Sequence, residues 1–280
     1  TDSINVQGEV QKTLDIVTHD LMVGSLSLCD RVAAMVSEEF PDLINNASCA
    51  SEANIVACFD PLDGSSNIET NSAIGTIFSL LRVGTRGKEV REKDVLNAST
   101  NQVAAGYALY GPACLLVLTT GKSVALFTLE PESDKFLLVR DRLSVAPEAG
   151  EFAINMAYQR FWDAKLSQYI GDCIAGKDGP RAKDFTMRWI ASMVAEVHRI
   201  FMRGGIFIYP ALARPGGSEG KLRFLYEANP MAMLIETAGG LAVTRTARIR
   251  DFSPKSLHQR VPVVLGSFEE VSLLAGLYAH

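Results

Sequence analysis

The sequence predicts an α+β protein in which two packed sheets are interleaved with helices. Of its 280 residues 48% are hydrophobic, which is enough to build a large core. Residues 74–139 are rich in aromatic and β-branched stretches separated by turn residues, a pattern typical of antiparallel strands. Residues 190–266 instead alternate helical and extended patterns. We therefore expect a mainly antiparallel sheet first and mixed helices and strands after it.

The N-terminal region predicts a helix followed by a strand. Apolar residues recur at helical spacing over residues 9–28, with Asp15 at the edge of the apolar face. Residues 31–36 predict a strand that leads directly into the acidic pair Glu38 and Glu39. The next segment is polar, so we expect a surface loop there.

The segment on which the functional interpretation rests is residues 55–67. Its first five residues are apolar and predict a buried strand. We expect Pro61 to end that strand, because proline has no N–H group for the sheet. Asp60 and Asp63 flank the resulting turn. Paired carboxylates at a strand exit are suited to holding a divalent cation.

The same turn carries further polar groups. The Leu62 carbonyl lies between the aspartates and completes a set of hard oxygen ligands for Mg²⁺, with Mn²⁺ as the alternative ion. Gly64, Ser65 and Ser66 follow, where backbone N–H groups can approach a phosphate. The other interpretation of this motif is a turn whose aspartates bond only to their own backbone.

Beyond this turn, the pattern predicts strands over residues 74–83, 102–118, 123–129 and 136–139. The chain becomes polar near Pro147 and Gly150. We take this region as the boundary between an N-terminal domain at residues 1–145 and a second domain at residues 146–280.

The second half contains two clear helix signals. An amphipathic helix from Ile190 to Phe201 is ended by two glycines, and a short buried strand follows at residues 206–209. Asn229 as N-cap and Pro230 in the first turn delimit another helix. The final strands are predicted over residues 241–244 and 261–266.

Composition excludes several classes of protein. A net charge of -5 argues against a nucleic-acid-binding surface. No apolar segment approaches the roughly 20 residues that span a bilayer, so we expect no membrane association. The 5 cysteines are scattered and lack a C-x-x-C pair, which favours reduced thiols over a zinc or redox site.

Several separated blocks resemble class I fructose-1,6-bisphosphatase, a member of the magnesium-dependent, lithium-sensitive sugar phosphatases. The blocks are residues 60–67, 75–78, 104–107, 205–210 and 226–231. The resemblance implies a layered αβαβα fold, with the family's first helices preceding Thr1. It also implies a cytoplasmic homo-oligomer, a tetramer, that removes the 1-phosphate of fructose 1,6-bisphosphate in gluconeogenesis or the Calvin cycle.

The resemblance also assigns metal ligands and groups that activate water. The implied ligands are Glu39, Asp60, the Leu62 carbonyl, Asp63 and Glu227. Glu38 and Asp15 are assigned to orienting and deprotonating the water, with Glu9 a weaker candidate. Without the resemblance, the acidic pair reads as solvated surface and Glu227 as an acid at a helix start.

The remaining assignments concern the two phosphates and the sugar. Gly64, Ser65 and Ser66 are expected to hold the departing phosphate. The residues expected around the sugar and the second phosphate are Asn155, Tyr158, Arg188, Tyr209, Lys221 and Arg223. In the family, the counterpart of Arg188 reaches into a neighbouring subunit. Trp189 stands where the family usually has a tyrosine, which leaves the sugar preference open.

Two alternatives to this activity remain. The first keeps the chemistry but acts on sedoheptulose 1,7-bisphosphate, or on both sugars. The second is a sugar-phosphate sensor that has lost catalysis. A sensor of this kind requires damaged metal ligands, whereas the acids of this chain are intact.

Overall fold

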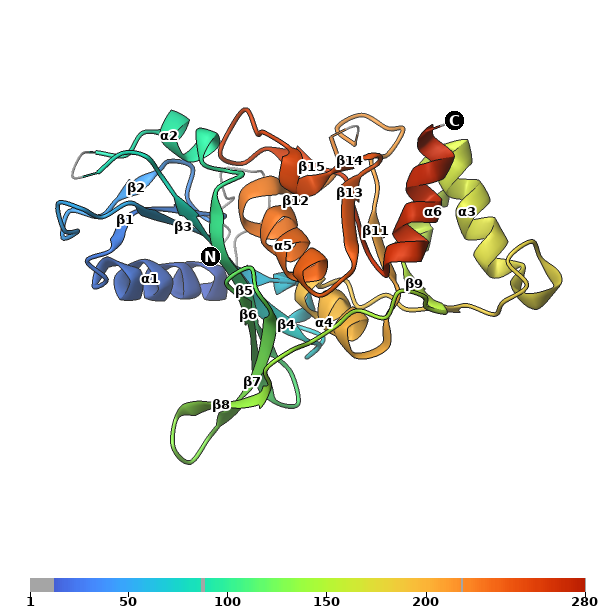
Figure 1. Cartoon of the computed structure of the whole chain (residues 1–280), viewed down its shortest axis with the longest axis horizontal. Coiled ribbons are helices and arrows are strands. Elements are labelled where there is room, and N and C mark those ends of the chain that lie inside the picture. Colours follow the sequence, from blue (N-terminus) through green and yellow to red (C-terminus); the bar gives the residue numbers. More distant parts are fainter. Residues whose placement is uncertain (1–12, 87–88, 218, 280) are drawn as a thin grey trace.

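Helices and sheets alternate through five layers (Figure 1). The computed structural model describes residues 13–86, 89–217 and 219–279 of the chain. Helix α1 covers the outer face of an eight-stranded sheet, and α4 and α5 lie between this sheet and a six-stranded one. Helices α3 and α6 cover the far face of the second sheet. This arrangement confirms the predicted layered αβαβα fold.

The helices have the following bounds: α1 Thr13–Ser27, α2 Glu92–Asn97, α3 Ala164–Ile174, α4 Met193–Arg203, α5 Asn229–Thr237 and α6 Phe268–Ala279. Shorter helical turns are η1 Ser65–Asn67, η2 Met156–Phe161, η3 Gly176–Asp178, η4 Phe224–Ala228 and η5 Ile249–Asp251. The sequence analysis did not predict α2, α3 and α6.

The first sheet has the strand order β2-β1-β3-β4-β5-β6-β7-β8. Its strands are β1 Val32–Ser37, β2 Ile44–Asn45, β3 Ile55–Asp63, β4 Ile74–Arg82, β5 Gln102–Tyr110, β6 Cys114–Thr119, β7 Val124–Glu130 and β8 Lys135–Arg140. Strands β1 and β3 pair in parallel, and the other neighbours pair antiparallel. The predicted antiparallel character is therefore confirmed.

Two predicted strand boundaries in this sheet were wrong. The single strand expected over residues 102–118 is a hairpin, because Gly111 and Pro112 turn the chain between β5 and β6. Strand β3 continues past Pro61 to Asp63 through a register shift. The irregularity takes Pro61 out of the ladder, so its missing N–H group does not end the strand.

The second sheet has the order β10-β9-β11-β16-β13-β14. Its strands are β9 Glu151–Ala153, β10 Thr186–Met187, β11 Ile206–Tyr209, β13 Leu241–Thr244, β14 Ala247–Arg248 and β16 Val263–Gly266. Strands β12 Leu222–Arg223 and β15 Arg260–Val261 form a separate ribbon. Pro262 divides the strand predicted over 261–266 into β15 and β16, since it cannot donate to a ladder.

The hydrophobic core is continuous between the two large sheets. One buried cluster contains Val36 and Ile77 from the first half together with Val194, Tyr226 and Met231 from the second. All strands of the first sheet precede the boundary expected at residues 145–146 in the sequence, and all strands of the second sheet follow it. The division into two domains stays a prediction, because these halves share packing.

Helix α1 buries only part of the apolar face predicted for it. Leu14 and Leu21 are 46% and 64% exposed, whereas Met22 and Leu26 pack against β1 and β3. Asp15 is buried. Apolar residues occur around much of this helix, so their spacing does not single out the side that contacts the sheet.

The start of α5 also differs from the prediction. Asn229 has helical backbone angles (φ −67, ψ −47) and is not an N-cap, because η4 precedes it without a break. Its side chain instead donates to the Ser99 carbonyl at 3.0 Å. Glu227 therefore lies within the wide turn η4 rather than at a strand exit.

Candidate active site

One cavity of about 290 Å³ collects the residues that the sequence singled out. The predicted residues that line it are Asp15, Glu38, Glu39, Asp60, Leu62, Asp63, Gly64, Ser65, Ser66, Asn155, Tyr158, Tyr209, Lys221, Arg223 and Glu227. Arg188 does not line it, and Glu9 lies outside the described residues. The fold thus brings together groups from both halves of the chain.

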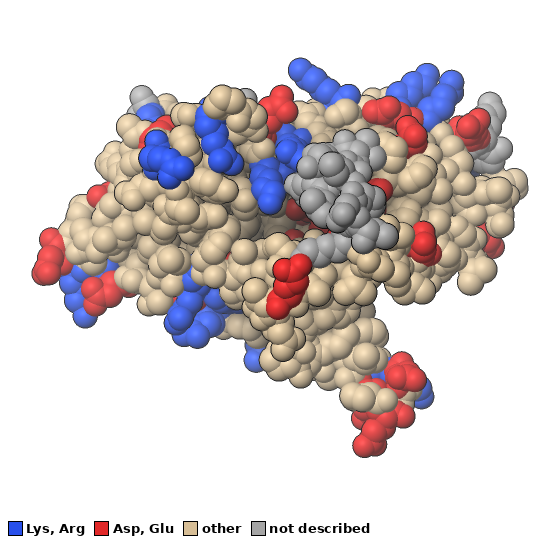
Figure 2. All heavy atoms as spheres, turned by 180° about the vertical axis from the view of Figure 1, so that it is seen from behind, with Lys and Arg blue, Asp and Glu red and all other residues tan. Residues whose placement is uncertain are grey.

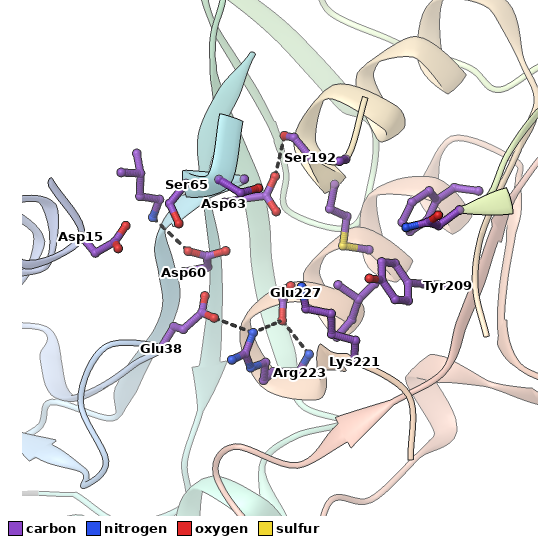
Figure 3. Close-up of a pocket in the computed structure, with 18 of the residues that line it drawn as sticks. Asp15, Glu38, Asp60, Asp63, Ser65, Ser192, Tyr209, Lys221, Arg223 and Glu227 are labelled. Atoms are coloured by element: carbon purple, nitrogen blue, oxygen red, sulfur yellow. Dashed lines mark hydrogen bonds and ion pairs between the residues drawn. The ribbon is translucent and has the colours of Figure 1, made fainter. Parts of the chain in front are cut away.

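Three buried carboxylates form the centre of this cavity. Asp60, Asp63 and Glu227 each offer an oxygen atom, and these atoms lie within 4.8 Å of one another. Strand β3 supplies the aspartates and η4 supplies the glutamate (Figure 3). Carboxylate oxygens are the ligands that Mg²⁺ and Mn²⁺ prefer, so this group is able to hold a divalent cation.

Hydrogen bonds fix the two aspartates. The Leu62 N–H group donates to Asp60 Oδ1 at 2.9 Å, which closes the turn. The Ser192 hydroxyl and the Val194 N–H group donate to Asp63 Oδ2 at 2.8 and 2.9 Å. Asp63 is thereby held at the N-terminus of α4. Ser192 was not among the predicted site residues, because the helical pattern was taken to begin at Ile190, whereas α4 begins at Met193.

A buried arginine lies beside the carboxylates. Arg223 is 3% exposed, and its Nη1 atom is 2.6 Å from Glu38 Oε1 (Figure 3). Its backbone N–H group donates to Glu227 Oε2 at 2.6 Å. The guanidinium therefore offsets part of the negative charge that β1, β3 and η4 bring together.

The carboxylates retain protons at higher pH than free acids do. Burial raises the pKa of Asp63 to about 6 against its hydrogen bonds, and raises that of Glu227 to about 8. Burial, followed by the charges of Glu38, Asp63 and Glu227, holds the pKa of Asp60 well above its usual range. A divalent cation that binds here must displace these protons, so its affinity depends on pH.

Helix α1 is anchored next to the acidic pair. His19 Nδ1 lies 2.7 Å from Ser37 Oγ, and the Glu39 N–H group donates to the same hydroxyl oxygen at 3.3 Å. Asp15 lies one helical turn before His19 and points into the cavity beside Glu38 (Figure 3). The contact between His19 and Ser37 thus places Asp15 and Glu38, the two candidates for activating water, near the candidate metal ligands.

The segment after Asp63 is tightly packed. Gly64 has φ 77, and a Cβ atom there would lie 2.7 Å from the Ser192 Cβ, so glycine is required. The next residues form the short turn η1, which includes Ser65. Asn67 donates to the Ile190 carbonyl at 2.8 Å and ties η1 to the segment before α4.

The other end of the cavity is aromatic and basic. Trp189 stacks on Phe207, with 6.2 Å between ring centroids, and lies beside Tyr209. Tyr158 and Lys221 complete this end. The sequence analysis had no signal for Phe207, because a phenylalanine in a buried strand is ordinary core.

A second cavity of about 310 Å³ adjoins the first and shares Tyr158, Tyr209 and Lys221 with it. It adds the cations Arg214 and Arg260. Figure 2 shows Lys and Arg side chains grouped beside a hollow on one face of the molecule, although the chain carries a net charge of -5. Positive charge is thus local, as an anionic ligand requires.

Arg188 lies apart from both cavities. Its side chain is 48% exposed, and its Nε atom is 3.9 Å from Glu151 Oε1. The expected role of this arginine in a neighbouring subunit's pocket stays a prediction.

Comparisons with known proteins agree on one family. A model described as the fructose-1-6-bisphosphatase N-terminal domain matches residues 1–141, and one described as its C-terminal domain matches residues 145–279. Fructose-1,6-bisphosphatase class 1 of Shewanella pealeana is 52% identical over 97% of this chain and 81% of its own length. The corresponding Shewanella woodyi protein is 49% identical over the same shares.

A solved structure is similar over the whole chain. The crystal structure of Leishmania major fructose-1,6-bisphosphatase in holo form has a TM-score of 0.92 and 35% sequence identity. The match covers 100% of this chain and 85% of that one.

The raised pKa values predict how stability changes with pH when no cation is present. The folded chain keeps protons on Asp63 and Glu227 that the unfolded chain has lost, so its free energy of unfolding falls as pH rises from about 4 toward 8. Asp63→Asn removes one such group and keeps an acceptor for Ser192 and Val194. In chelator, we expect the free energy of unfolding of this variant to rise relative to that of the parent by about 2–3 kcal/mol as the pH is raised from 4 to 7.

Urea unfolding of both proteins at several pH values measures this difference. A stability difference that does not change with pH would contradict the protonated cluster.

Proposed function

The chain belongs to the class I fructose-1,6-bisphosphatase family, and from this premise we propose that it hydrolyses the 1-phosphate of fructose 1,6-bisphosphate. The products are fructose 6-phosphate and inorganic phosphate. The observation that carries the proposal is the group of buried carboxylates Asp60, Asp63 and Glu227, which faces a cavity lined by phosphate-binding residue types. The enzyme is a phosphoric monoester hydrolase.

The donor set fits Mg²⁺, with Mn²⁺ as the alternative, because every ligand in it is a hard oxygen. Asp60, Asp63, Glu227 and the Leu62 carbonyl would hold the ions. When bound, such ions shield the phosphoryl oxygens, acidify a water molecule and stabilise the leaving oxygen.

The two acids of the pair, Glu38 and Glu39, are given different roles. Glu39 was predicted as the ligand and Glu38 as the base, but we propose the reverse. In support, Arg223 Nη1 lies 2.6 Å from Glu38 Oε1 and 3.9 Å from Glu227 Oε2, and Glu38 lies beside Asp60 in Figure 3. Glu39 and Asp15 line the same cavity, and we assign them to orienting the water and taking its proton.

The departing phosphate is assigned to the turn after Asp63. Gly64 lines the cavity and permits the left-handed turn packed against Ser192, and Ser65 and Ser66 offer hydroxyl and N–H donors. Arg223 was expected near the sugar and the second phosphate, but we assign it to the departing phosphate, because its guanidinium lies beside Glu38 and Glu227.

The second phosphate is assigned to the basic end. Asn155, Tyr158, Tyr209 and Lys221 line the first cavity there. Arg214 extends this end into the second cavity, with its guanidinium 4.5 Å from the centroid of the Tyr158 ring. Stacking on a tyrosine orients a guanidinium and leaves its edge free to form bidentate bonds with phosphate.

A second candidate substrate is sedoheptulose 1,7-bisphosphate, alone or together with fructose 1,6-bisphosphate. The adjoining cavity beyond Tyr158 and Lys221 supports this candidate, because it offers length for one more carbon. Comparing the turnover of the two purified sugars distinguishes the alternatives.

We also propose that the chain forms a homo-oligomer, a tetramer, as the resemblance implies. Strand β8 is an edge strand, and its residues Phe136, Leu137, Leu138 and Val139 are 42–56% exposed. An uncovered apolar edge promotes aggregation, and a second copy would cover it. Sedimentation as a 30.4 kDa monomer would contradict this assembly.

The cellular setting rests on the resemblance alone. Within the described ranges, each helix is too short or too polar to cross a membrane. Residence in the cytoplasm and a place in gluconeogenesis or the Calvin cycle stay predictions.

Removing one ligand tests the catalytic proposal against the sensor. We expect the parent to release phosphate from fructose 1,6-bisphosphate only with Mg²⁺, and Asp63→Asn to lose at least about 100-fold in kcat/KM, because cation binding and phosphate activation both fail. A phosphate-release assay with and without Mg²⁺ measures both. A parent that binds the sugar but releases no phosphate would identify a sensor.

Removing one cationic side chain, that of Arg214, tests the site assigned to the second phosphate. We expect Arg214→Ala to raise KM for the bisphosphate roughly 10-fold with little change in kcat, because a charged hydrogen bond distant from the reaction is lost. Arg160→Ala is the matched control, since Arg160 also stacks on an aromatic ring, that of Phe161 at 4.5 Å, but lines neither cavity. Equal effects of the two variants would place the second phosphate elsewhere.

A further inference from the structure

We propose that His258 is a positioning residue that holds the acidic pair in register with Glu227. The inference deepens the proposed function, because it concerns how the two halves of the cation site are kept at a fixed separation. His258 lies outside the cavity, so it touches neither substrate nor cation.

The His258 ring contacts two segments that are distant in the sequence. Its Nδ1 atom lies 2.8 Å from the Tyr226 hydroxyl, and its Nε2 atom lies 2.9 Å from the Pro41 carbonyl oxygen. The Tyr226 and His258 rings also meet edge to face, with 5.9 Å between centroids. One imidazole therefore joins the segment after β1 to the turn η4.

In a neutral His258 ring, the contact with Pro41 determines which ring nitrogen carries the proton. A carbonyl oxygen only accepts hydrogen bonds, so Nε2 must carry the proton that Pro41 receives. In the neutral ring Nδ1 then has a free lone pair, and it accepts the Tyr226 hydroxyl proton. Both ring nitrogens are thus used, with donor and acceptor roles that do not interchange.

Each contact lies close in sequence to a candidate ligand. Tyr226 is fully buried and directly precedes Glu227. Pro41 follows Glu38 and Glu39 with Phe40 between them, so its position restrains where the pair leaves β1. Shifting either segment would change the distances between these carboxylates.

The His258 loop is itself fixed to the same turn. The Phe224 N–H group, at the start of η4, donates to the Gln259 carbonyl at 2.8 Å. The next residue, Arg260, pairs with Arg223 in the ribbon formed by β12 and β15. The loop that carries His258 is therefore attached to η4, and the His258 ring connects it to Pro41.

This link is independent of the contact inside the cavity. Glu38 and Arg223 also join the two segments, but that ion pair must change when a cation takes up Glu38. The bonds of His258 involve neither group, so they persist when the site is loaded. They therefore preorganise the ligands, which lowers the cost of assembling them around the cation.

The chain supplies a matched control. His198 on α4 makes the same type of pair, with its Nδ1 3.0 Å from the Tyr107 hydroxyl and 6.2 Å between ring centroids. Both Tyr107 and His198 lie outside the cavity. Loss of His198 removes a tyrosine–histidine hydrogen bond without affecting Pro41 or Tyr226.

The experiment measures Mn²⁺ binding to the substrate-free protein by calorimetry, and the Mg²⁺ concentration that half-saturates phosphate release. The variants are His258→Asn, which keeps an acceptor for Tyr226 but cannot reach Pro41, and His258→Gln, which keeps a donor for Pro41. Tyr226→Phe removes the other bond alone, and His198→Asn is the control. Thermal unfolding in chelator shows which variants are folded.

We expect His258→Asn and Tyr226→Phe each to weaken Mn²⁺ binding about fivefold, the effect of one lost hydrogen bond. The half-saturating Mg²⁺ concentration should rise in parallel while the KM for sugar bisphosphate stays the same. His258→Gln should retain part of the affinity, and His198→Asn should bind as the parent does.

Parent-like Mn²⁺ binding by the folded His258 and Tyr226 variants would overturn the inference, as would equal weakening in His198→Asn. If His258→Asn does not fold, the result for Tyr226→Phe decides. A parent that binds Mn²⁺ but does not hydrolyse the sugar bisphosphate would refute the proposed function and leave this inference standing.

Discussion

Repulsion among buried acids is the constraint on which the rest of the site depends. Asp60, Asp63 and Glu227 lie within 4.8 Å of one another in a poorly solvated cavity, where like charges cannot all be ionised without compensation. The protein compensates with protons, with the Arg223 guanidinium beside Glu38 and with hydrogen bonds from the start of α4 to Asp63. A divalent cation would replace the protons and neutralise the cluster more completely. The way the chain holds these acids together therefore favours the binding of a divalent cation.

Three local irregularities of the fold occur where this cluster is built. Strand β3 shifts register at Pro61, Gly64 adopts φ 77, and η4 widens the helical turn that carries Glu227. Each feature departs from regular structure within a few residues of a carboxylate. Regular strands and helices surround them and hold these segments in place, which is how strained or irregular backbone persists at functional sites.

The sequence predicted which residues line the cavity better than it predicted the helices around them. Strand β3 and its acidic turn were recognisable because an apolar run led directly into paired aspartates. Part of the face predicted for α1 is exposed because apolar residues lie around most of that helix. Asn229 is not an N-cap because η4 continues into α5, and its amide donates to the Ser99 carbonyl instead. Such outcomes depend on tertiary contacts that local spacing does not encode.

The same limit applies to supporting residues. Ser192 reaches Asp63 and His258 bonds to Pro41 over separations of more than 100 residues, so neither contact has a signature in local pattern. Arg214 was not singled out from the sequence, and only its stacking on Tyr158 places it beside the basic end. The resemblance singled out residues that line the cavity, while the groups that position them emerged only from the folded arrangement.

The central claim is that acids from opposite halves of the chain bind divalent cations together. Crystals soaked in Mn²⁺ test it most directly, because anomalous diffraction locates the metal without reference to activity. The account predicts Mn²⁺ within about 2.3 Å of carboxylate oxygens from Asp60, Asp63 and Glu227. Anomalous density that is absent from this cluster, or that leaves Glu227 without a bond to metal, would contradict it.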